Sequence, residues 1–199
     1  MLRLRNAHPA RPDAPRHQNL QQKQNDPSQH TETVESFMRP GLSHTTTLLV
    51  GLGNPIMGDD AVGIHVVRML KDRNFGRADL EFKELSLGGL GLVEEILGYE
   101  RVFIIDSVAS TGAAGKICEF SPEDFKGTEY ASSPHSTNFA TALELFRRFE
   151  NSAVPHTIRI FTIDITPEFT FREALSPPVQ RAAFELAELV GNEIQQIRN

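Results

Sequence analysis

A glycine-rich loop joins an expected strand to an expected helix early in this chain. Residues 47–52 form an apolar run typical of a buried strand, and residues 60–71 repeat apolar side chains at helical spacing. Gly53 and Gly58 lie in the loop between them, and Gly51 and Gly63 lie in the adjoining ends of the strand and the helix. A strand, a tight glycine loop and a helix in this order favour a parallel α/β arrangement.

The same alternation continues to the end of the chain. Further strands are expected at residues 79–85, 101–106, 116–120 and 157–163, and further helices at residues 90–97, at residues 139–149 and from residue 176 onward. The third helix is expected to bury Phe139, Leu143, Phe146 and Phe149. Five strands alternating with four helices predict an α/β fold, a three-layer α/β/α sandwich with a mostly parallel, about five-stranded sheet.

Composition divides the chain into two regions. Residues 1–45 are rich in Gln, Asn, His and Pro and are expected to be a disordered tail, whereas residues 46–199 form the predicted domain. The net charge of −6 argues against nucleic acid as the main partner. We find neither an apolar run of membrane-spanning length nor a secretory signal in the sequence. The single cysteine, Cys118, favours a reducing compartment, and we expect the cytoplasm.

Three loops at one predicted edge of the sheet carry groups that could perform chemistry. In parallel sheets, ligands bind beyond the carboxyl ends of the strands. Asp59 and Asp60 lie in the first loop, Asp106 ends the apolar strand 101–106, and His135 precedes the third helix. Two carboxylates and an imidazole could hold a divalent metal ion with open positions, and zinc, nickel, manganese and iron suit this set equally.

Each residue also has a structural interpretation. Asp59 or Asp60 could cap the following helix, Asp106 could bond its own turn, and His135 could be an exposed loop residue. Convergence of three groups on one edge favours the metal site. His65, His156 and Cys118 are expected to be structural or solvated. Asp164 is a further acidic candidate for the same edge of the sheet.

Two other chemistries fit less well. The dinucleotide-binding fingerprint requires a third glycine where this chain has Ile56, and the Asp59–Asp60 pair would repel a pyrophosphate. Ser107, Asp106 and His135 are the residue types of a serine hydrolase. However, neighbouring side chains on a strand point in different directions, which disfavours that set.

At these positions the sequence resembles the nickel–iron hydrogenase maturation endopeptidases. Residues 53–63 are similar to the opening motif of that family, residues 102–106 to its second acidic site, and residues 133–136 to its histidine segment. The resemblance implies an α/β/α sandwich with Asp60, Asp106 and His135 as ligands and catalytic residues. It also implies a single cut near the C-terminus of a hydrogenase large-subunit precursor, after nickel insertion.

The resemblance further implies that nickel is carried by the substrate, so that the enzyme would test for metal before cutting. Zinc or another divalent ion could occupy the free enzyme. One segment departs from the family pattern: residues 86–91 keep the glycines of an Asp-Gly-Gly-Thr motif that the family links with substrate choice, but lack its Asp and Thr. The alternatives left open are a non-catalytic nucleotide- or metal-binding α/β module and a metal-dependent hydrolase of a small substrate.

Overall fold

The computed structural model describes residues 47–73, 77–125, 138–149, 153–167 and 171–197. Their strands are β1 (Thr47–Leu52), β2 (Leu80–Leu85), β3 (Arg101–Ala109), β4 (Ile117–Phe120) and β5 (Thr157–Ile165). Their helices are η3 (Gly58–Ala61), α1 (Val62–Asp72), α2 (Gly89–Ile96), α3 (Pro122–Phe125), α4 (Phe139–Phe149) and α5 (Pro177–Gln196). The predicted tail, residues 1–45, lies outside the described residues.

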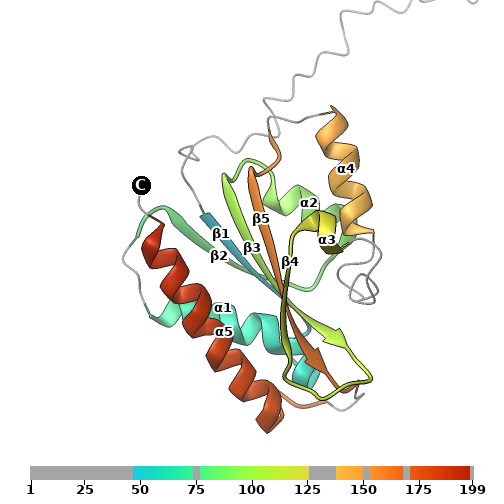
Figure 1. Cartoon of the computed structure of the whole chain (residues 1–199), viewed down its shortest axis with the longest axis vertical. Helices are drawn as coiled ribbons and strands as arrows, with labels where there is room; N and C mark the ends of the chain where they lie inside the picture. The colour runs from blue at the N-terminus through green and yellow to red at the C-terminus, as the bar shows by residue number, and fades with distance from the viewer. Residues whose placement is uncertain (1–46, 74–76, 126–137, 150–152, 168–170, 198–199) are drawn as a thin grey trace, which may run out of the picture. The chain divides into compact units, whose positions relative to one another are not determined.

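These strands form one sheet in the order β2-β1-β3-β5-β4. β1, β2, β3 and β5 run parallel, and the edge strand β4 pairs antiparallel with β5. Helices α1 and α5 cover one face of the sheet, and α2 and α4 cover the other (Figure 1). The predicted three-layer α/β/α sandwich with a mostly parallel sheet is therefore confirmed.

Side-chain alternation along the central strands produces two separate cores. On β3, Phe103 and Ile105 pack with α1 and α5, whereas Ile104 and Val108 pack with α2 and α4. Because both faces are covered, residues 102–108 are all buried, as a central parallel strand requires. The same alternation fixes the face on which each polar residue of β3 and β5 lies.

The structure differs from the sequence prediction in three places. β3 continues to Ala109, so Asp106 lies within this strand rather than at its end, because β5 pairs with β3 along its whole length. The short helix α3 was not expected. Phe149 is 79% exposed rather than buried: it lies ten residues after Phe139 and is therefore rotated by about 80° from that buried side chain around α4.

The described helices include none that is both long enough and apolar enough to cross a membrane. The longest of them, α5, has 20 residues, and charged residues lie between the buried apolar residues along its sequence. Its buried side chains contact the sheet face shared with α1.

Candidate functional site

The candidate site lies where β1 leaves the sheet and β3 continues. β1 pairs with β3 as far as Gly51 opposite Ile105. A side chain at Gly63 would place its Cβ 2.2 Å from the carbonyl oxygen of Ile105, so α1 begins in direct backbone contact with the sheet. At Gly53, where φ is +142°, a Cβ would lie 2.1 Å from the carbonyl oxygen of Asp60. The glycines of the first loop therefore bring Asp60 against the ends of the central strands.

Asp60 is held by two hydrogen bonds from outside its own helix. Its Oδ2 accepts the backbone N–H of Asn54 at 2.8 Å, and its Oδ1 accepts the hydroxyl of Ser107 at 3.1 Å. Neither η3 nor α1 has a side-chain cap at its N-terminus. The capping interpretation of Asp60 is therefore wrong, and its carboxylate instead connects the first loop to β3.

Asp106 lies in β3 immediately before Ser107 and is buried, with 1% of its surface exposed. Its Oδ1 accepts the backbone N–H of Ser107 at 2.8 Å. Ser107 thus donates to both acidic residues, through its amide to Asp106 and through its hydroxyl to Asp60. Ser107, which fits the sequence only as a disfavoured nucleophile, is therefore a structural neighbour of both acidic residues, and their grouping with His135 as a metal site stays a prediction.

Asp59 has a different role from its neighbour. Its Oδ1 accepts the backbone N–H of Ser176 at 2.6 Å, and its Oδ2 accepts the Ser176 hydroxyl at 2.7 Å. Ser176 is the N-cap residue of α5, so Asp59 binds the residue that precedes a distant helix and does not cap the helix that follows Asp59 itself. Arg172 lies 3.5 Å from the same carboxylate and pairs with Met57 in a short parallel bridge. The segment before α5 therefore fixes the loop that carries Asp60.

His135 lies outside the described residues, so its position relative to Asp60 and Asp106 stays a prediction. Within the described ranges, no three His, Cys, Asp or Glu side chains come together as a metal-binding group. The two carboxylates supply hard oxygen donors, which bind divalent cations, but a complete ligand set would need donors from elsewhere.

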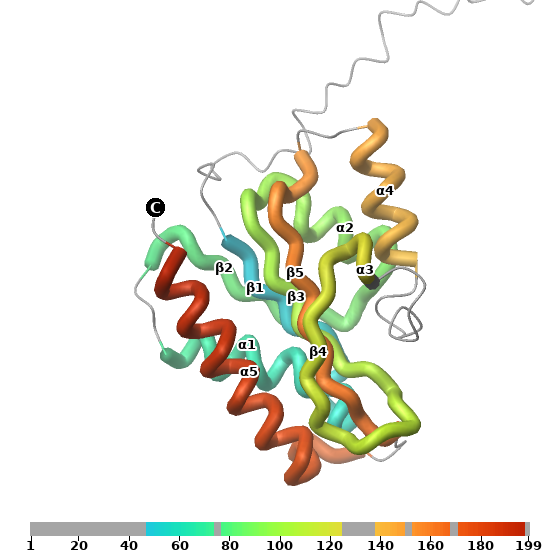
Figure 2. Tube along the Cα trace, viewed as in Figure 1, coloured from blue at the N-terminus to red at the C-terminus, as the bar shows by residue number. Residues whose placement is uncertain are grey.

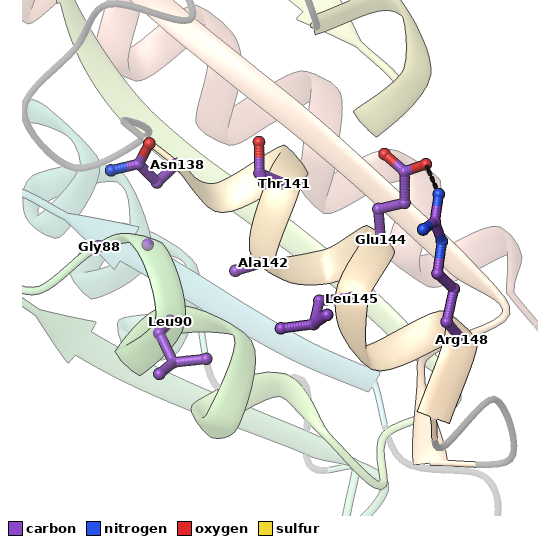
Figure 3. A pocket seen from close by; sticks show the side chains of 9 residues that line it. Gly88, Leu90, Asn138, Thr141, Ala142, Glu144, Leu145 and Arg148 are labelled. Carbon is purple, nitrogen blue, oxygen red and sulfur yellow. Dashed lines mark hydrogen bonds and ion pairs between the residues drawn. The ribbon is translucent and has the colours of Figure 1, made fainter.

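A groove of about 780 Å³ lies between α2 and α4. Figure 3 shows Ala142 and Leu145 of α4 pointing toward α2. Gly88, at the start of α2, lines the same groove and belongs to the segment whose motif departs from the family pattern. Ser86, two residues earlier, donates its hydroxyl to the carbonyl oxygen of Gly53 at 2.7 Å. The loop before this groove is therefore tied to the loop that carries Asp60.

The other residues singled out by sequence occupy structural positions. His65 is half-buried within α1, and His156 is exposed just before β5. Cys118 is partly buried and packs against the core on the α2 and α4 side of the sheet. Asp164 is 2% exposed in β5 and lies on the same sheet face as Asp106.

Comparison with known proteins identifies the family. The model of the HycI hydrogenase maturation protease family matches residues 64–193. The chain belongs to the hydrogenase maturation proteases, endopeptidases that cleave the C-terminal extension of the hydrogenase large subunit. The resemblance seen in the sequence is thereby confirmed. Comparison with curated protein sequences gave no match.

Solved structures share the fold. The hydrogenase maturating endopeptidase HybD from E. coli has 20% sequence identity and a TM-score of 0.58, over 76% of this chain and 93% of that chain. HycI from Thermococcus kodakarensis KOD1 has 22% identity and a TM-score of 0.57, over 74% and 91%. HybD from Thermococcus kodakarensis has 23% identity and a TM-score of 0.53, over 74% and 97%.

Proposed function

We propose that this protein removes the C-terminal extension of a nickel–iron hydrogenase large-subunit precursor after nickel insertion, in the cytoplasm. The observation that supports the proposal is that the carboxylates of Asp60 and Asp106 both accept a hydrogen bond from Ser107, one from its hydroxyl and one from its backbone N–H. The family supports the endopeptidase reaction and a hydrogenase precursor as substrate. The use of nickel for recognition is the step that we add.

In this proposal, Asp60, Asp106 and His135 contact the nickel ion held by the precursor. Asp60 is half-buried, and both of its carboxylate oxygens accept hydrogen bonds from neighbouring residues. A negative group in such a position gains free energy when a cation arrives, because its partial desolvation is then compensated. A precursor without nickel brings no such charge to the two carboxylates. Discrimination between loaded and empty precursor follows from that difference.

The chain's own residues account for orientation and proton transfer. Hydrolysis adds water across one peptide bond: the water oxygen bonds to the carbonyl carbon, the C–N bond breaks, and a proton reaches the leaving amine. A carboxylate of the site would accept the proton from water and return it to that amine. A bound divalent cation supplies Lewis-acid polarisation. Zinc or another divalent ion in the free enzyme would use the same donors.

The groove between α2 and α4 is the proposed contact for the precursor beyond the metal. Leu90 and Leu145 border it, and their side chains are 52% and 51% exposed. The groove adjoins residues 86–91, the segment that the family resemblance links with substrate choice. We therefore assign to it an apolar segment of the precursor, placed when the nickel ion reaches the two carboxylates.

The test uses purified precursor with and without nickel. Wild-type protein is expected to shorten only the nickel-loaded precursor, detected as a mass change. Asp60→Asn and Asp106→Asn are expected to slow this cut by at least about a hundredfold. Glu185→Gln, an exposed position of α5 on the other face of the sheet from the groove, serves as a control with normal activity. Normal cutting by Asp60→Asn, or equal cutting of both precursor forms, would contradict the proposal.

A further inference from the structure

Two buried polar atoms on β5 have no hydrogen-bond partner among the described residues. These are Oδ1 of Asp164 and Oγ1 of Thr162, in side chains that are 2% and 0% exposed. An unpaired buried hydroxyl is costly, and an unpaired buried carboxylate oxygen is more so. The proposed reaction, as described above, uses neither residue. Their position in the sheet indicates what they serve.

Strand register places Thr162 opposite Asp106 and Asp164 two residues further along β5. β3 and β5 are parallel, with Asp106 opposite Thr162 and Val108 opposite Asp164. Val108 belongs to the core beneath α2 and α4. Residues two apart on a strand share a face, so Asp106, Thr162 and Asp164 all lie on the α2 and α4 face, toward the carboxyl ends of the strands.

The end of β5 is held by backbone hydrogen bonds on the side away from β3. The turn that joins β3 to β4 lies along the end of β5 (Figure 2), where Gly115 donates its N–H to the carbonyl oxygen of Asp164 at 2.8 Å. The N–H of Asp164 donates to the carbonyl oxygen of Lys116 at 2.9 Å. Both backbone groups of Asp164 are thus paired, and the strand cannot rotate to release its side chain to solvent without breaking them. The buried carboxylate is held in place by its backbone.

Asp106 and Asp164 are buried aspartates on one face of the sheet, and the unpaired hydroxyl of Thr162 lies between them in the strand register. This arrangement favours the binding of a cation. Carboxylate and hydroxyl oxygens are donors for hard and borderline divalent ions. We propose that Asp164 is a further oxygen donor of this site, which binds the divalent cation together with Asp106. The inference rests on the proposed function, because that function brings the cation to Asp106.

Asp164 would then add an oxygen donor to those that Asp60 and Asp106 supply to the cation. The described His, Cys, Asp and Glu side chains form no group of three that could hold a metal ion, so the proposed donors on β3 and β5 are the carboxylates of Asp106 and Asp164 with the hydroxyl of Thr162. The free energy lost by burying Oδ1 of Asp164 without a hydrogen-bond partner would be recovered on cation binding. This arrangement predicts opposite effects of one substitution on stability and on metal affinity.

The test compares Asp164→Asn with Asp79→Asn in the full-length protein. Asp79 is also buried, 9% exposed, but it precedes β2 at the opposite edge of the sheet and is paired with Arg77. Without metal, Asp164→Asn is expected to raise the melting temperature by about 2–4 °C, whereas Asp79→Asn lowers it. In calorimetric titration with Ni²⁺ alone, Asp164→Asn is expected to weaken binding about tenfold or more, and Asp79→Asn to leave it unchanged.

Three results would overturn the inference: no Ni²⁺ binding by the wild-type protein, wild-type affinity in Asp164→Asn, or a lowered melting temperature in Asp164→Asn with unchanged affinity. The cleavage assay separates this failure from failure of the proposed function. If Asp60→Asn loses cutting while Asp164→Asn keeps it, only the role of Asp164 is wrong. If Asp60→Asn cuts nickel-loaded precursor normally, the proposed function itself is wrong.

Discussion

Asp59 accepts two hydrogen bonds from Ser176, one from the backbone N–H at 2.6 Å and one from the hydroxyl at 2.7 Å. The two residues are 117 positions apart in the sequence. Ser176 begins α5, and Asp59 immediately precedes the candidate site residue Asp60. These two hydrogen bonds therefore attach the loop that carries Asp59 and Asp60 to the N-terminal end of α5.

Substituting Asp59 should destabilise the protein through this contact. Asp59→Ala removes both acceptors while Asp59 is 7% exposed, so we expect the free energy of unfolding to fall by about 2–3 kcal/mol. Ser176→Ala keeps the backbone hydrogen bond and should cost about 1 kcal/mol. Urea denaturation at pH 7 measures both. Equal losses in the two variants would show that the backbone hydrogen bond contributes nothing.

Two helical glycines should respond in opposite ways to alanine. At Gly63, an added Cβ would lie 2.2 Å from the Ile105 carbonyl oxygen and 2.5 Å from that of Leu52, so α1 would have to move off the sheet. We expect Gly63→Ala to destabilise by about 3 kcal/mol or more, as overpacking against fixed backbone does. At Gly91 the nearest atom is 3.5 Å away, in Leu87, and Gly91→Ala should be neutral or stabilise by up to about 1 kcal/mol. Thermal unfolding followed by circular dichroism distinguishes these outcomes; similar melting temperatures would refute the close packing of α1.

The Arg77–Asp79 pair should make stability depend on pH in the acid range. The hydrogen bond from Arg77 lowers the pKa of Asp79 below its usual 3.8. The folded state therefore binds this proton less readily than the unfolded state. The resulting stabilisation is fully present above about pH 4 and is lost as the pH falls through the lowered pKa.

Asp79→Asn should accordingly lower the free energy of unfolding at pH 7, and the difference from wild type should shrink toward pH 2. Urea denaturation across this range provides the measurement. Glu84→Gln is the control, because the hydrogen bond from Arg68 also lowers the pKa of Glu84. That pair is exposed, with side chains 49% and 39% accessible, so solvent screening should leave a smaller difference. A constant difference between Asp79→Asn and wild type at all pH values would argue against the linkage.

Polar substitutions in the α2–α4 groove should weaken precursor binding without affecting bond cleavage. Leu145→Gln is expected to raise KM several-fold at unchanged kcat, because an apolar contact with the precursor is lost. Leu189→Gln on α5 is a matched control, since Leu189 is also exposed, at 46%, but belongs to a helix on the other face of the sheet. Cleavage of nickel-loaded precursor over a range of concentrations tests the difference. An unchanged KM in Leu145→Gln would remove the groove from the substrate contact.

The architecture followed from the sequence because its signals are local. Buried parallel strands need continuous apolar runs such as residues 102–105, and helices on a sheet need apolar stripes such as that of α5, so period and run length predict both. Strand ends were less predictable. Asp106 was expected to end its strand, yet β3 continues because β5, more than fifty residues later, supplies hydrogen bonds along its whole length.

The chain's residues by themselves determined the layers and the strand-to-helix loops. Only the tertiary structure decided which partner each polar side chain meets. Asp59 and Asp60 are neighbours with the same chemistry, but one meets Ser176 and the other meets Asn54 and Ser107. Strand pairing likewise decided that Asp164 is buried two residues beyond the Asp106–Thr162 pair. Hydrogen-bond partners distant in sequence depend on how elements pack in three dimensions, and that information is absent from any local pattern.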